Sequence, residues 1–259
     1  MSEVVNQIIE LYRLRQDMIK ASTKLSLQAQ AIIRRITGFG KEDNVAGILK
    51  AAREDVTHEY HMAIMPHSMA MEPLEQQRAM YEKELVKLVK QLPAYEFVKN
   101  MKGFGDLSFA CIIGESGDLS KYSNPSKLWK RLGLAVMDGT RQGNPGKNAT
   151  AEDWIAHGYS KQRRSVVWNA GNNMIGGMGK FRPVYGENVD ENDAYTPMQR
   201  LFANRARYEQ QKLGFEIEQS KTGKESYKFH AANRAKRYVE KRVVRDLWNF
   251  WNGKEAPVY

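Results

Sequence analysis

An uninterrupted apolar periodicity in the first part of the chain places the strongest constraint on the fold. Apolar residues recur at helical spacing from Val5 to Ile36, and no proline or glycine occurs before Gly38. Spacings of three and four residues place these side chains on one side of a helix, where another helix must cover them. The sequence therefore predicts a long amphipathic helix and a mainly α fold.

Two further helices are predicted before Pro93, where the sequence divides into two regions. Ala46–Met65 reads as the second helix and Pro73–Leu92 as the third. Long antiparallel helices pack as a hairpin or coiled coil, so we expect residues 1–92 to form a helical coiled-coil region. Their apolar faces have little else to cover them, which predicts a homo-oligomer formed through these helices; packing within one chain is the alternative.

A glycine-containing turn interrupts the helical pattern within residues 95–115. Gly103 and Gly105 allow the positive φ values of a tight hairpin, and Phe104 can fill the gap between the two helices. Amides from Gly105 onward open a new helix, and such amides bind phosphate. This helix-hairpin-helix turn predicts contact with nucleic acid independent of base sequence, supported by Lys102 beside it. An ordinary helical hairpin with glycine caps is the alternative.

The charge balance favours an anionic partner. Of the 259 residues, 40 are Lys or Arg and 30 are Asp or Glu, which gives a net charge of +10 and a pI near 9.5. Nucleic acid and an acidic membrane surface both fit this charge. No run of 18 apolar residues occurs, and the mean hydropathy is -0.62, so we expect a cytoplasmic protein and no membrane partner. Cys111, the single cysteine, excludes an intramolecular disulfide.

The histidines do not predict a metal site. His58 and His61 lie three residues apart, with Glu59 and His67 nearby. This pattern lacks the pair of histidines four residues apart that places two zinc ligands on one helix face, and no third ligand is evident. We therefore predict neither a metal nor a cofactor.

Residues 93–259 contain the more distinctive sequence motifs. Asn124 has the features of an N-cap and Pro125 those of a first helical residue, which predicts a short basic helix that ends at Gly133. Another helix is expected to contain His157–Ala170. We expect residues 176–223 to form a flexible arm that contains one helix at about 196–213.

The last helix combines an apolar stripe with many cations. It is expected over Ala231–Tyr259, with Val239, Val243 and Leu247 on its buried side. Cations interleaved with aromatic residues suit phosphate pairing and base stacking, whereas the alternative places the aromatics in the core and the cations in solvent. Together with the turn, the predicted nucleic-acid contacts are Lys102, Gly103, Phe104, Gly105, Lys127, Lys130, Arg131, Lys161, Arg163, Arg164, Arg234, Arg237, Lys241, Arg242 and Arg245.

The order of these segments resembles the C-terminal part of the bacterial insertion-sequence transposases of the one-ten group, which include the pilin-gene-inverting recombinases. Those proteins join a nuclease-like domain with an Asp-Glu-Asp-Asp acid set, a coiled coil and a helix-hairpin-helix transposase domain. The resemblance covers the last two parts, and the chain shows no apolar strands with spaced acids. It is carried by Ile8–Ile36, Met101–Gly105, Asp118–Leu134, Tyr159–Ala170 and Ala231–Tyr259.

The resemblance implies DNA recombination and a bacterial or phage origin, and it makes 176–223 an insertion. The family's catalytic serine follows its Gly-Leu pair, but here the corresponding turn contains only Thr140 as a hydroxyl. Thr140 is thus a positional candidate, and a threonine nucleophile would need a base within reach. No other catalytic residue is predicted.

Three functions follow as hypotheses. The first is a DNA-binding protein related to these transposases without cleavage activity of its own. The second is a recombinase subunit whose nuclease-like domain is supplied by a partner chain. The third is a structured-RNA binder, because contacts to phosphate distinguish DNA from RNA weakly.

Overall fold

The protein is mainly helical, as the sequence predicts. The structure is a computed structural model that describes residues 2–137, 139–143, 145–146, 148–176, 195–214, 217–219, 225–227 and 229–255. Within these residues, no helix is long and apolar enough to cross a membrane. The chain forms two compact units, one of Gln7–Lys87 and one of Met1–Asn6 with Leu88–Tyr259. The first is called the hairpin unit below and the second the C-terminal unit.

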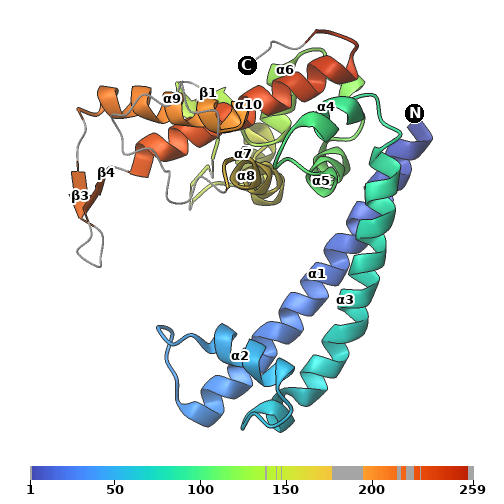
Figure 1. The fold of residues 1–259 in the computed structure, drawn as a ribbon, viewed down its shortest axis with the longest axis vertical. Helices are drawn as coiled ribbons and strands as arrows, with labels where there is room; N and C mark the ends of the chain where they lie inside the picture. The colour runs from blue at the N-terminus through green and yellow to red at the C-terminus, as the bar shows by residue number, and fades with distance from the viewer. Residues whose placement is uncertain are drawn as a thin grey trace. The chain divides into compact units, whose positions relative to one another are not determined.

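Two long antiparallel helices build the hairpin unit. They are α1 (Ser2–Thr37) and α3 (His61–Val89), with the short helix α2 (Val45–Glu54) between them in sequence. Figure 1 shows α1 and α3 side by side within this unit. An ion pair of 2.8 Å joins Arg15 of α1 to Glu82 of α3. These two residues fix the antiparallel register at one end of the pair.

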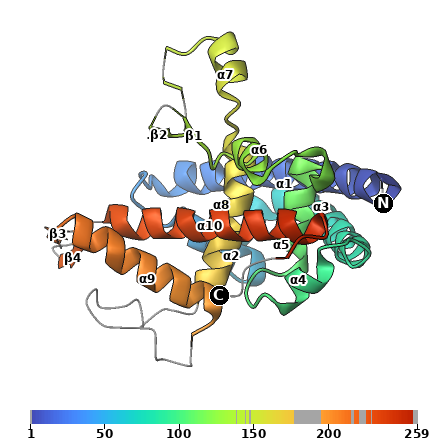
Figure 2. The ribbon, with the colours of Figure 1, turned by 90° about the horizontal axis from the view of Figure 1, so that it is seen from above.

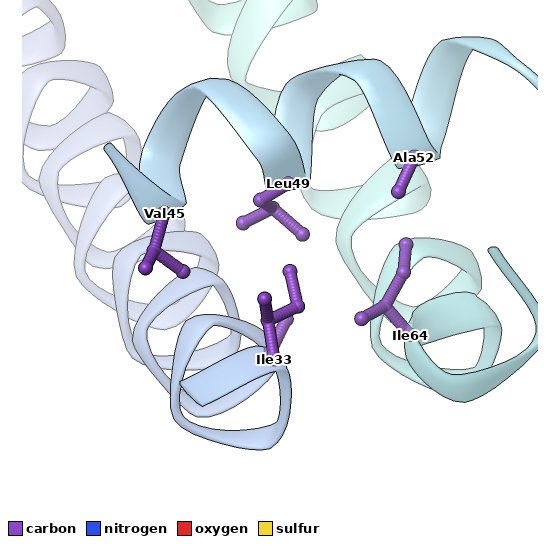
Figure 3. Close-up of a cluster of buried hydrophobic side chains, with 6 residues drawn as sticks. Ile33, Val45, Leu49, Ala52 and Ile64 are labelled. Carbon is purple, nitrogen blue, oxygen red and sulfur yellow. The ribbon is translucent and has the colours of Figure 1, made fainter. Parts of the chain in front are cut away.

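A small apolar core closes the other end of the hairpin unit. Ile33 of α1 and Ile64 of α3 are fully buried, and Leu49 of α2 packs over both (Figure 3). Asn44 caps α2 by accepting a hydrogen bond from the amide of Gly47 at 3.1 Å. The cap orients α2 so that its apolar side covers the two long helices. The cluster consists of Ala29, Ile33, Val45, Leu49, Ala52 and Ile64.

The predicted boundaries of the second and third helices are wrong. The second helix ends at Glu54 and not at Met65, because the carboxylate of Asp55 accepts hydrogen bonds from the amide and hydroxyl of Thr57 and so forms a turn. The third helix begins at His61 and continues through two prolines, Pro66 and Pro73, rather than beginning at Pro73. Both prolines are exposed, so the carbonyls that lose a helical partner can bind water.

Short helices around one long helix make up the C-terminal unit. The last helix, α10 (Phe229–Trp251), packs against α4, α6, α8 and α9 (Figures 1 and 2). The other elements are α4 (Tyr95–Asn100), α5 (Asp106–Ser116), η1 (Leu119–Lys121), α6 (Pro125–Arg131), α7 (Ala151–His157), α8 (Lys161–Ile175) and α9 (Pro197–Lys212). Two antiparallel strand pairs complete it, β1 (Val136–Met137) with β2 (Thr140–Arg141) and β3 (Ile217–Gln219) with β4 (Glu225–Tyr227).

The apolar stripe predicted for the last helix is the centre of this unit's core. Val239, Val243 and Leu247 are buried on α10. Trp248 and Trp251 are buried as well, and their indole N–H groups donate to the Tyr122 carbonyl at 2.8 Å and to the Asp118 carboxylate at 3.0 Å. These aromatic residues thus lie in the core, as the alternative interpretation of this helix expected.

Three helix ends in this unit refine the sequence analysis. Asn124 caps α6 as predicted, with Pro125 as its first residue. The single helix expected over His157–Ala170 is wrong: α7 ends at His157 with Gly158 as its C-cap, at a φ of 67°, and α8 begins after Ser160, its N-cap. The C-terminal helix ends at Trp251, and residues 256–259 lie outside the described part.

The structure can be compared with the predicted division of the chain and with part of the predicted arm. The compact units divide between residues 87 and 88, whereas the sequence divides at 92 and 93. Of the predicted arm over 176–223, residues 177–194, 215–216 and 220–223 lie outside the described part. Its expected helix is present as α9, which Thr196 caps through the amide of Gln199.

Candidate nucleic-acid interface

The glycine turn has the backbone geometry that the sequence predicts. Gly103 and Gly105 have φ values of 86° and 73°, and Phe104 is buried between them. A methyl group on Gly103 would lie 2.7 Å from the carbonyl oxygen of Asn173, so the turn packs closely against the end of α8. Gly105 is the N-cap of α5 and has no side chain to bind the first amides of that helix. Because no side chain caps them, those amides can donate hydrogen bonds to an anion. Lys102, nearby in sequence, is exposed.

Helix α6 presents two exposed lysines and one anchored arginine. Lys127 and Lys130 are exposed, and neither forms an ion pair with the described residues. The Nε–H of Arg131 donates to the carbonyl oxygen of Glu115 at 3.0 Å, which ties α6 to the end of α5. Burial lowers the pKa of Arg131, and the nearby positive charge of Arg163 lowers it further. Arg131 and Arg163 thus approach each other although α6 and α8 are separate in sequence.

Three cations occupy the first turn of α8. The guanidinium of Arg163 lies 3.4 Å from the Glu115 carboxylate, and that of Arg164 lies 2.7 Å from the Glu240 carboxylate. Lys161 is exposed and has no ion-pair partner among the described residues. A helix N-terminus already carries partial positive charge, so cations at this end repel the helix dipole. Of the three cations in this turn, Lys161 is thus the one that keeps its charge in solvent.

The sequence of α8 itself contains no acidic residue, and the carboxylates that pair with Arg163 and Arg164 come from α5 and α10. Its 15 residues read KQRRSVVWNAGNNMI. Lys161, Ser165, Trp168 and Asn172 follow one another at intervals of four, three and four residues, which places them on one face of the helix. Trp168 is 47% exposed on this face. The face combines a cation, hydroxyl and amide groups, and one large aromatic ring.

A buried carboxylate holds the basic helix against α10. Glu240 of α10 is fully buried, and a methyl group on Gly171 of α8 would lie 2.9 Å from its Cγ. Burial raises the pKa of Glu240, whereas the positive charges of Arg164, Lys236 and Arg237 lower it. Burial also lowers the pKa of Lys236 to about 8, and Glu240 opposes this shift. The glycine in α8 gives Glu240 the room to reach its cationic partners.

Arg237 serves as a clamp on the chain that follows α6. Its guanidinium donates to the carbonyl oxygens of Gly133 at 3.3 Å and Ala135 at 3.0 Å. Burial lowers the pKa of Arg237, and the charges of Arg164 and Arg141 lower it further. Arg141, which the sequence analysis did not select, is exposed on β2 and thus joins the cations at this junction.

The other predicted cations of α10 also have partners within the chain. Arg234 lies 3.2 Å from the buried carboxylate of Glu209, and Arg245 lies 2.8 Å from the buried carboxylate of Asp246. The amino group of Lys241 lies 4.9 Å from the centre of the Trp129 ring. The guanidinium of Arg242 donates to the Tyr238 hydroxyl at 2.7 Å. A phosphate would have to compete with these contacts, unlike at Lys127, Lys130 and Lys161.

Thr140 lies in the β1–β2 hairpin. Its hydroxyl donates to the carbonyl oxygen of Met137 at 2.9 Å. The buried side chain of Gln142, which the sequence analysis missed, fixes the base of this hairpin by donating to the carbonyls of Lys130 at 3.1 Å and His157 at 3.2 Å. The hydroxyl of Thr140 is therefore held within its own turn.

An open cleft of about 650 Å³ lies between this hairpin and α7. Met137, Asp153 and His157 contribute to its lining. The Asp153 carboxylate accepts the amide hydrogen of Thr150 at 2.8 Å and thereby completes a capping box. The Nε2 atom of His157 accepts the amide hydrogen of Gly143 at 3.4 Å. Both titratable groups of the cleft thus have structural tasks.

The structure brings together α6, α8 and α10, which carry most of the predicted contacts. Among the described residues, no group of three His, Cys, Asp or Glu side chains is arranged to hold a metal ion. Glu240 and Trp168 were missed by the sequence analysis, and Lys236, one of the cations of the last helix, was not among the predicted contacts. A signal was present for Trp168, since α8 contains a tryptophan and no acid, but the buried pairing of Glu240 depends on a helix that is distant in sequence.

Comparison of the chain with protein-family models, with curated proteins and with solved structures gives no match.

Proposed function

We propose that the C-terminal unit binds nucleic acid through backbone phosphates at the junction of α6 and α8. The observation that carries the proposal is the first turn of α8, where Lys161 is exposed without an ion-pair partner among the described residues, in a helix of 15 residues that has no acid of its own. An unpaired cation such as Lys161 at a helix N-terminus costs about 0.3–1 kcal/mol, and an anion bound there removes that cost. We therefore expect α8 to be more stable with a phosphate bound at its first turn than without one.

The surroundings of α8 support the same ligand. Lys127 and Lys130 are exposed on α6, and Lys161 is exposed on α8. The glycine turn adds the uncapped amides of α5. All of these groups recognise phosphate and none reads a base edge, so we propose binding that depends on charge and backbone shape more than on sequence. The resemblance to insertion-sequence transposases favours DNA, with structured RNA as the alternative.

The salt dependence of binding tests this proposal. Affinity is measured for duplex DNA, single-stranded DNA, branched DNA and structured RNA over a series of salt concentrations. Each phosphate contact contributes a slope of about −0.9 on duplex DNA in a plot of log affinity against log salt concentration. Lys130→Gln and Lys161→Gln should each weaken binding to every sequence alike and reduce the magnitude of the slope by about one unit.

Lys83 supplies the matched control for these variants. It is an exposed lysine on α3 of the hairpin unit, outside the proposed interface. Lys83→Gln should leave both affinity and slope unchanged. If all three variants lower the slope equally, binding follows overall charge and the α6 and α8 junction is not a defined interface.

We also propose that the hairpin unit forms a homo-oligomer with a second copy of the chain. Met62, Met69 and Met80 are exposed on α3, and their spacing of seven and eleven residues places them on one line along the helix. Exposed apolar side chains along one line of a helix favour a protein contact. Replacement of all three by Gln should shift the sedimentation coefficient towards the monomer, whereas Val56→Gln, at an exposed apolar residue outside α3, should not.

A further inference from the structure

Trp168 differs from Trp129, Trp248 and Trp251, whose indoles are hydrogen-bonded within the fold. The indole N–H groups of Trp129, Trp248 and Trp251 donate to Lys241, Tyr122 and Asp118 respectively. Trp168 is 47% exposed and forms no such hydrogen bond with the described residues. Exposure of a ring this large costs free energy, because about 25 cal/mol is lost for each Å² of apolar surface left in water.

The inner side of the Trp168 ring is held by a buried cation. The amino group of Lys236 lies 3.7 Å from the ring centre, and it hydrogen-bonds to the side chain of Asn172 one turn further along α8. Lys236 is itself only 6% exposed and lies beside Glu240. Figure 2 shows α8 crossing α10, the helix that supplies Lys236. The amino group covers one face of the ring, so the opposite face is the one that a ligand could stack on.

The chemistry of the surrounding face selects the partner. Lys161, Ser165 and Asn172 share the helix face of Trp168, and Asn169 beside it is exposed. With a rise of 1.5 Å per residue, Lys161 lies about 10 Å from Trp168 along the helix axis. An apolar protein surface would find one ring among polar groups, whereas a nucleic-acid strand offers a base for the ring and a phosphate for the lysine.

We propose that Trp168 is a stacking platform for an unpaired nucleobase of DNA or RNA. In a regular duplex both faces of each base are covered by neighbouring base pairs, so only an unpaired or extruded base can stack on a protein ring. The inference rests on the proposed phosphate-binding function. It adds that the protein prefers single-stranded, mismatched or distorted nucleic acid to regular duplex.

The test compares strands with and without bases. The full chain is titrated with a 15-nucleotide oligothymidylate, with the matching oligouridylate, with an abasic 15-mer that retains every phosphate, and with a 15-base-pair duplex. The wild type should bind the two strands with bases more tightly than the abasic strand. Trp168→Ala should weaken binding to those strands by about 5- to 150-fold and leave the abasic affinity and the salt slope unchanged.

Three further variants separate stacking from loss of structure. Trp168→Phe retains an aromatic face and should restore most of the affinity, whereas Trp168→Leu is apolar without a π face and should not. Phe250→Leu removes an exposed ring that already stacks on Phe97, with ring centres 4.6 Å apart, and should have no effect on binding. Thermal unfolding of each variant confirms that it is folded.

The outcomes distinguish the inference from the function on which it rests. Equal affinities of the wild type for the abasic strand and oligothymidylate would overturn the inference, as would equal affinities of Trp168→Leu and Trp168→Phe for oligothymidylate. Both results leave phosphate binding intact if the salt slope persists. Absence of salt-dependent binding to all four probes would overturn the proposed function itself.

Discussion

The guanidinium of Arg164 on α8 lies 2.7 Å from the carboxylate of Glu240, which is fully buried on α10. This ion pair joins α8 to α10 through two residues that are 76 positions apart in sequence. Gly171 leaves space for the carboxylate, and Lys236 adds a second cation beside it. The proposed phosphate-binding helix is therefore held in place by a fully buried carboxylate and by cations that are largely buried.

Removal of the buried carboxylate should destabilise the protein strongly. Glu240→Gln leaves Arg164 and Lys236 without their shared counter-charge, and loss of one partner of a buried ion pair costs about 3–5 kcal/mol. Urea unfolding should show this decrease in the free energy of unfolding. Glu84→Gln breaks an exposed pair with Lys87 and should cost at most about 1 kcal/mol. Equal losses in the two variants would contradict a structural task for Glu240.

Lys236 should make stability depend on pH in the alkaline range. Burial lowers the pKa of Lys236 from 10.5 to about 8, with Glu240 opposing the shift. Between these two pKa values the unfolded chain binds more protons at this residue than the folded chain, so the free energy of unfolding should rise with pH there. Urea unfolding from pH 7.5 to 10 should show a rise in the wild type relative to Lys236→Met, which has no amino group to titrate. Parallel curves would contradict the lowered pKa.

The two glycines of the turn should respond differently to a methyl group. Both have positive φ and so both variants are strained, but only Gly103→Ala also meets backbone atoms, at 2.7 Å from the Asn173 carbonyl oxygen. A methyl group on Gly105 would meet no other part of the fold within 4 Å. Gly103→Ala should therefore lower the free energy of unfolding by about 1–3 kcal/mol more than Gly105→Ala. Equal losses would mean that the turn does not pack closely on α8.

Gly105→Ala is then the variant that tests phosphate binding by the turn. The substitution alters the backbone at the start of α5 and should weaken binding to all nucleic-acid sequences by the same factor. Unchanged affinity in the folded variant would remove the turn from the interface and leave α6 and α8 in place.

Thr140→Ala should leave nucleic-acid binding unchanged, and the purified protein with Mg²⁺ or Mn²⁺ should neither cut nor rejoin DNA. The Thr140 hydroxyl donates to Met137 within its own hairpin, and a threonine nucleophile would need a base in reach. Gel analysis of labelled branched and duplex DNA is the measurement. Strand transfer by the wild type that is lost in Thr140→Ala would show a threonine recombinase instead.

Local features were well predicted from the sequence. The long first helix, the cap at Asn124, and the positive φ of Gly103 and Gly105 depend on residues close to one another in the chain. Helix caps and glycine conformations involve contacts over about four residues, so the local sequence is sufficient to identify them. The errors were at Asp55, Pro66 and Gly158, where one residue type is compatible with more than one backbone conformation.

The tasks of the individual cations were decided by tertiary structure. In sequence, Arg164, Arg237 and Lys161 are equivalent positive charges with equal claim to a phosphate. In the fold, Arg164 meets Glu240 and Arg237 binds the carbonyls of Gly133 and Ala135, whereas Lys161 stays in solvent. Net charge depends on composition alone and so is a property of the sequence. Which charges are neutralised depends on carboxylates and carbonyls that only folding brings within about 3 Å, where charged hydrogen bonds form.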